Sequence, residues 1–126
     1  MEDMLQEFLT ETNESVAELD VELVTLEQRP DDPELLGSIF RLAHTIKGSC
    51  GFLGLGRLET LPHSAENVFG KLREGELVVT EEIITLILQS MDRIKTILYC
   101  LEQDGTEPEG GDGDLIERLD KVAATA

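Results

Sequence analysis

Residues 36–53 read LGSIFRLAHTIKGSCGFL, and their apolar side chains recur every three or four positions. The apolar positions are Leu36, Ile39, Ala43, Ile46, Cys50 and Leu53. This spacing is typical of an amphipathic α-helix that buries one face. Glycine inside a helix costs about 1 kcal/mol relative to alanine, so Gly48 and Gly51 are unexpected here. The pattern predicts a helix, and its glycines need a separate explanation.

The same helical period recurs in the rest of the chain, and no segment alternates as a strand would. Helices are predicted at about residues 3–28, 33–53, 57–74, 81–103 and 114–123. Asp32 before Pro33 and Thr80 before two glutamates are good helix starts. Residues 105–113, GTEPEGGDG, predict a flexible acidic linker.

Pro62 lies within the third predicted helix, where a proline removes a hydrogen bond and clashes one turn back. We therefore expect the regular helix either to begin near Leu61 or to be kinked. Either arrangement would affect the neighbouring side chain of His63.

The lengths of these segments predict an all-α fold in a single domain, residues 1–126. Four long helices joined by short connections form antiparallel neighbours. The expected architecture is an antiparallel up-down four-helix bundle with a short fifth helix at the C-terminal end.

The composition excludes several classes of partner. The chain has 10 basic and 27 acidic residues among 126, which gives a formal net charge of −17. Such a chain is a poor ligand for nucleic acid or for an anionic membrane surface. No signal peptide or membrane-spanning run is apparent, and the two cysteines match no metal-ligand spacing. We expect a cytoplasmic protein with free thiols and no membrane insertion.

His44 is predicted on the rim of the second helix, one step of about 100° from the core position Ala43. Lys47 and Gly48 share this flank because they follow His44 by three and four residues. Lys47 can reach a group attached to the imidazole. Gly48 leaves the next turn without a side chain, so another protein's backbone could approach closely.

Glu66 and His63 share a flank of the third predicted helix, since they are three residues apart. If the second and third helices are antiparallel neighbours, this flank could meet that of His44. A carboxylate bonded to one ring nitrogen would fix the tautomer and leave the other nitrogen nucleophilic. The predicted chemistry is a histidine that accepts and releases a phosphoryl group, with Lys47 offsetting its charge.

Other readings of these side chains remain open at this point. His44, His63 and Glu66 could bind zinc, although a neighbouring lysine argues against a metal site. They could also be ordinary surface residues of a non-catalytic helical adaptor. The chain lacks a Walker-type loop and a kinase signature, so we expect no bound cofactor and no ATP site of its own. Whether it counts as an enzyme by itself is left open.

The run IFRLAHTIKGSCGFLGLGRLE, followed by HSAEN and KLREGEL, resembles histidine phosphotransfer (HPt) domains. It is particularly similar to the N-terminal phosphoacceptor domain of CheA-type chemotaxis histidine kinases. The opening FLTETNESVAELDVELVTLE is similar to the first helix of that domain, so the resemblance covers nearly the whole chain. A His-x-x-Lys-Gly motif alone is weak, but the His-x-x-Glu that follows on the next helix makes it specific.

The resemblance implies a five-helix fold and a role for each motif residue. His44 would be phosphorylated at Nε2, and Glu66 would orient it through Nδ1. Lys47 would supply phosphate electrostatics, His63 would assist the polar network, and Gly48 would keep the docking surface clear. Pro62 departs from the alanine that related sequences tend to carry.

The partners implied by the resemblance are all proteins. The donor would be the kinase ATP-binding domain, which alone would hold ATP and Mg²⁺. The acceptor would be an aspartate of a CheY- or CheB-type response regulator. A stand-alone HPt phosphorelay shuttle with the same site is the alternative.

Overall fold

The structure is a computed structural model that describes residues 2–125, and in that range it contains helices and no strands. The helices are α1 (Glu2–Gln28), α2 (Pro33–Phe52), α3 (Gly56–Arg73), α4 (Glu81–Asp104) and α5 (Gly113–Ala124). Each bound lies within one residue of the position predicted from the periodicity. The all-α fold is confirmed.

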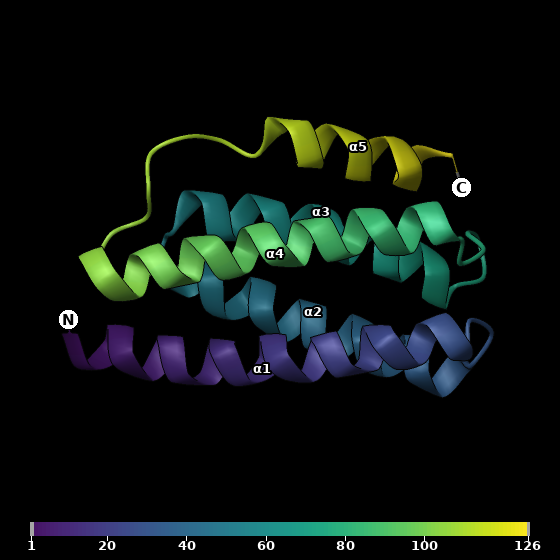
Figure 1. The fold of residues 1–126 in the computed structure, drawn as a ribbon, viewed down its shortest axis with the longest axis horizontal. Coiled ribbons are helices and arrows are strands. Elements are labelled where there is room, and N and C mark those ends of the chain that lie inside the picture. Colours follow the sequence, from purple (N-terminus) through teal and green to yellow (C-terminus); the bar gives the residue numbers. More distant parts are fainter. Residues whose placement is uncertain (1, 126) are drawn as a thin grey trace.

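The first four helices run alternately up and down, as Figure 1 shows. Helix α1 packs against α2 and α4, and α3 packs against the same two helices from the opposite side. Helix α5 lies outside this bundle, against α3 and α4. The predicted four-helix bundle with a fifth helix is therefore the observed architecture.

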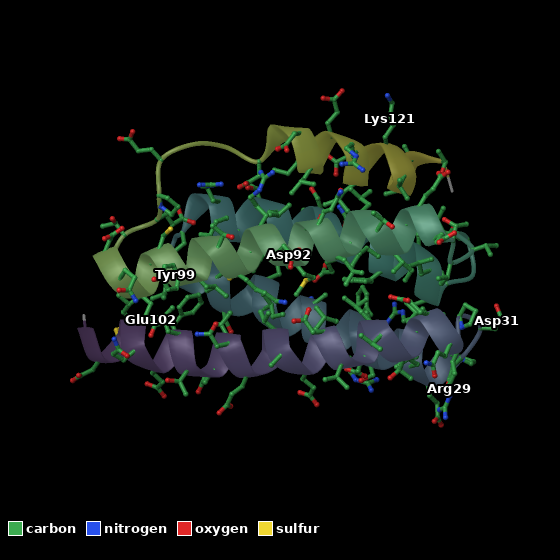
Figure 2. All side chains as sticks on the ribbon, viewed as in Figure 1. Arg29, Asp31, Asp92, Tyr99, Glu102 and Lys121 are labelled. Carbon is green, nitrogen blue, oxygen red and sulfur yellow. The ribbon has the colours of Figure 1, made fainter. Side chains whose placement is uncertain are left out.

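The core consists of one apolar stripe from each helix. In α2 the buried side chains are Leu36, Ile39, Ala43, Ile46 and Cys50, which belong to the stripe read from the sequence. Figure 2 shows oxygen-tipped side chains along the outer edge of α1, which faces away from the bundle. Within the described residues, no helix is long and apolar enough to cross a membrane.

Two helix starts are capped as the sequence predicts. The Asp32 carboxylate accepts hydrogen bonds from the backbone N–H groups of Glu34 and Leu35, and Pro33 opens α2. The Thr80 hydroxyl accepts from the N–H of Ile83 at the start of α4. These caps satisfy donors that have no partner within the helix and fix where each helix begins.

The acidic segment 105–113 is held to the rest of the fold by two arginines. Its Asp112 is buried and accepts hydrogen bonds from the guanidinium groups of Arg57 and Arg93, at 2.7 and 3.1 Å for the closest pairs. The same Arg57 donates to the carbonyl of Pro108. The composition indicates an acidic linker but not these contacts, because the arginines that hold this segment lie far away in the sequence.

Glu107 explains why α3 begins earlier than Pro62 suggests. Its carboxylate accepts from the N–H groups of Arg57 and Leu58, at 3.3 and 2.9 Å, and so caps the helix from the linker. A negative group at this end is also favoured by the helix dipole. The helix thus begins at Gly56 and continues through Pro62, so the expected late start near Leu61 is wrong.

Candidate functional site

His44 and Glu66 face each other across the contact between α2 and α3. The Nδ1 atom of His44 lies 2.7 Å from Oε2 of Glu66. The His44 side chain is 64% exposed, whereas that of Glu66 is 10% exposed. The Glu66 carboxylate is therefore largely buried, and the His44 imidazole extends from it toward solvent.

Lys47 completes this group from one turn further along α2. Its Nζ atom donates a hydrogen bond of 3.1 Å to Oε1 of Glu66, the oxygen that His44 does not use. Each carboxylate oxygen thus has its own donor. The structure brings together the three residues that the sequence placed on two separate helices.

Glu66 keeps its negative charge despite its position. Burial by itself would raise the pKa of this carboxyl, but the hydrogen bonds from His44 and Lys47 outweigh burial and lower the pKa below its ordinary value of 4.5. A lowered folded-state pKa contributes stability above about pH 4.5, which is lost as the pH falls through the folded-state value. The carboxylate is ionised at neutral pH.

This geometry leaves Nε2 as the ring nitrogen of His44 that Glu66 does not contact. A neutral imidazole carries one N–H and one lone pair, and a carboxylate at Nδ1 keeps the proton on that nitrogen. The lone pair is then on Nε2. With Nδ1 held by the buried carboxylate and most of the ring in solvent, the arrangement can act as a nucleophile toward a large partner.

Gly48 lies between two surface grooves beside His44. One groove, between α1 and α2, is lined by Phe8, His44, Gly48 and Leu53 among others. The other, between α2 and α3, is lined by Lys47, Gly48 and His63 among others. A Cβ added at Gly48 would meet no atom within 4 Å, so the space above this residue is open. Nothing inside the fold requires a glycine at this position.

His63 is the predicted site residue that the structure leaves apart. It is exposed and shares the α2–α3 groove with Lys47. In the described part of the chain, no side-chain hydrogen bond joins it to His44, Lys47 or Glu66. Its assisting role therefore stays a prediction.

The arrangement of these side chains does not support a zinc site at His44, His63 and Glu66. Among residues 2–125, no three His, Cys, Asp or Glu side chains are grouped as metal ligands. Lys47 occupies the second oxygen of Glu66. Of the cysteines, Cys50 is buried in the core, and burial raises the pKa of its thiol to about 12, so it is a poor nucleophile.

Two residues next to the site were missed as contributors. The ring of Phe40 is stacked with that of His44, and the guanidinium of Arg73 lies over Phe40. Helical spacing places Phe40 on the flank of His44, four residues before it, but gives it no role there. Arg73 lies on another helix, so only the fold reveals the second.

Comparison with known proteins identifies the family. The sequence profile of the Hpt domain matches residues 3–97. The chain belongs to the Hpt domain family. Its resemblance to CheA-type phosphoacceptor domains is also confirmed, since the sensor histidine kinase CheAY of Helicobacter pylori is 40% identical over 121 residues. That match covers 96% of this chain but only 15% of the relative, so the chain spans a small part of such proteins.

Solved structures give the same answer for the fold. The CheA phosphotransferase domain of Thermotoga maritima is 32% identical, with a TM-score of 0.76 over 79% of this Hpt domain and 94% of that chain. The phosphorylated P1 domain of CheA3 from R. sphaeroides, solved in complex with CheY6, has a TM-score of 0.88 over 100% of both chains. Its 23% identity supports the shared fold alone.

Proposed function

We propose that this Hpt domain is the phosphoacceptor of a chemotaxis histidine kinase. Nε2 of His44 accepts a phosphoryl group from a separate ATP-binding kinase domain and passes it to an aspartate of a CheY- or CheB-type receiver domain. The observation that carries this proposal is the 2.7 Å contact between Nδ1 of His44 and the buried Glu66 carboxylate, with the rest of the ring exposed.

In the first step, the Nε2 lone pair attacks the γ-phosphorus of ATP. The N–P bond forms as the bond from phosphorus to the β–γ bridging oxygen breaks, and ADP leaves with that electron pair. Because Nδ1 keeps its proton, the phosphorylated ring carries a positive charge. The Glu66 carboxylate stabilises that charge directly through Oε2. Lys47 donates to Oε1 of the same carboxylate, one helical turn from His44.

In the second step, a carboxylate oxygen of the receiver aspartate attacks the same phosphorus. The N–P bond breaks, and its electron pair returns to Nε2. The ring is then neutral, with its proton still on Nδ1, so the domain is ready for another cycle. No proton has to leave the site in either step.

We further propose that the domain binds no cofactor of its own. ATP and Mg²⁺ are held by the kinase domain, and the whole cycle takes place in the cytoplasm, where ATP is available. The match to chemotaxis kinases favours this assignment over a stand-alone phosphorelay shuttle. A shuttle would take its phosphoryl group from a receiver aspartate, and a helical adaptor would take none.

Incubation with radiolabelled ATP and a CheA-type kinase domain tests the proposal. We expect the domain to take a label that is lost in acid and stable in base, as a phosphorus–nitrogen bond requires. His44→Gln should abolish labelling, whereas His63→Gln, which changes the only other histidine, should keep it. Full labelling of His44→Gln would refute the assignment.

Gly48→Leu should separate docking from folding. The added side chain meets no atom within 4 Å at its Cβ, so the free energy of unfolding should stay the same or rise by up to about 1 kcal/mol. Phosphorylation should fall about tenfold, because the leucine lies in the path of the approaching kinase. The measurements are urea unfolding and initial labelling rates.

Gly51→Leu is the matched control for this prediction. Gly51 is equally open, but it lies about 10 Å along the helix from His44, whereas Gly48 lies about 6 Å away. Equal losses of phosphorylation in the two variants would show that Gly48 has no special place in docking.

A further inference from the structure

Phe40 places its ring nearly parallel to that of His44. It lies one helical turn before His44 on α2, and the two ring centroids are 6.3 Å apart with an angle of 13° between the planes. Aromatic rings attract each other in such an offset, parallel arrangement. Because His44 is largely exposed, this is one of few contacts that can restrain its ring.

Phe40 is itself held by α3. The guanidinium carbon of Arg73 lies 4.0 Å from the Phe40 ring centroid, which is a close cation–π contact. On the same helix, a Cβ added at Gly70 would come within 3.3 Å of Cε1 of Phe40. The ring therefore packs directly on the α3 backbone at Gly70, with Arg73 over it.

We infer that Phe40 is a positioning residue for His44 and that Arg73 holds Phe40 in place, an inference that rests on the proposed function. The hydrogen bond to Glu66 fixes where Nδ1 lies, but the imidazole can still turn about that bond. A parallel neighbouring ring restrains this rotation. The two restraints together fix the direction of the Nε2 lone pair, and in-line attack on phosphorus depends on that direction.

Both restraints come from one helix. Glu66, Gly70 and Arg73 lie on consecutive turns of α3, and they act on His44 and Phe40 of α2. The hydrogen bond and the aromatic stack thus form one continuous contact between the two helices. Loss of either one leaves His44 with a single restraint.

Kinetics of phosphorylation by a CheA-type kinase domain test this inference on the intact 126-residue chain. Phe40→Leu should lower the turnover number about tenfold and leave KM for the domain within twofold. Arg73→Gln should lower the turnover number about two- to fivefold. Arg73→Lys should recover most of this loss because lysine restores a cation over the Phe40 ring. Arg29→Gln, which removes the same charge at the turn between α1 and α2 (Figure 2), should have no effect.

Nuclear magnetic resonance gives a second readout that needs no kinase. Residual dipolar couplings of the His44 ring C–H bonds report how far the ring plane is fixed. They should shrink in Phe40→Leu and Arg73→Gln and remain unchanged in Arg29→Gln. Backbone couplings in α2 should stay the same, which distinguishes a mobile ring from a disturbed helix.

The outcomes separate this inference from the proposed function. Absence of labelling in the native chain would refute the proposed function, while the couplings would still show whether Phe40 orients His44. Normal labelling of the native chain, with Phe40→Leu and Arg73→Gln both within twofold of it, would overturn the positioning role. Unchanged ring couplings in both variants would overturn it as well.

Discussion

Glu66→Gln should lower the rate of phosphorylation of His44 by about 10- to 100-fold. Glu66 uses both carboxylate oxygens, Oε2 toward His44 and Oε1 toward Lys47. An amide has only one oxygen, so one of these two donors loses its acceptor. The substitution also removes the negative charge that stabilises the phosphorylated, positively charged ring. Initial rates at saturating kinase domain measure the effect.

Glu59→Gln provides the control for this experiment. Glu59 is exposed and lines the α2–α3 groove. The Glu59→Gln substitution removes the same charge from the same helix as Glu66→Gln does. Its rate should stay close to that of the native chain. If Glu66→Gln were within threefold of Glu59→Gln, the contact between Glu66 and His44 would have no catalytic importance.

Asp112→Asn should lower the free energy of unfolding by about 3 kcal/mol, the lower end of the loss when one partner of a buried ion pair is removed. The Asp112 side chain is 1% exposed and lies between two arginines, Arg57 and Arg93. Removing its charge leaves the Arg57 guanidinium without its carboxylate partner, while Arg93 keeps only its exposed pairing with Asp114. Urea unfolding measures the loss, and amide hydrogen exchange should increase first in α5, which this network attaches to the bundle.

Asp114→Asn is the matched control, since Asp114 pairs with the same Arg93 but is 62% exposed. Exposed ion pairs contribute little, so its loss of stability should be much smaller. The hydrogen bond from Arg57 lowers the pKa of Asp112 below its ordinary value of 3.8, against the opposing effect of burial. Its contribution is therefore present above about pH 3.8 and is lost as the pH falls through the folded-state value. Equal losses in the two variants would contradict the structural role of Asp112.

The helices could be predicted from sequence because each carries its own periodic stripe and, at Asp32 and Thr80, its own cap. Such signals lie within a few residues of the element that they define. The cap of α3 could not be predicted in this way, because it is Glu107, about fifty residues away along the chain. For the same reason, nothing local identified Arg57 and Arg93 as partners of Asp112.

The site shows the same division between local and distant information. Helical spacing placed His44, Lys47 and Gly48 on one flank of α2 before any fold was known. The pairing with Glu66 needed the further assumption that α2 and α3 are neighbours, and the structure has that contact. Arg73 lies too far from Phe40 in sequence for spacing to connect them, and His63 proved to be a neighbour in a groove rather than a hydrogen-bonding partner.

In the proposed function, Nε2 of His44 carries the phosphoryl group while Glu66 holds Nδ1. Phosphorus–nitrogen correlation by nuclear magnetic resonance on the ¹⁵N-labelled, phosphorylated chain tests it most directly. The phosphorus should couple to Nε2 of His44, and Nδ1 should keep its proton. Coupling to Nδ1 of His44, or to either nitrogen of His63, would contradict this assignment.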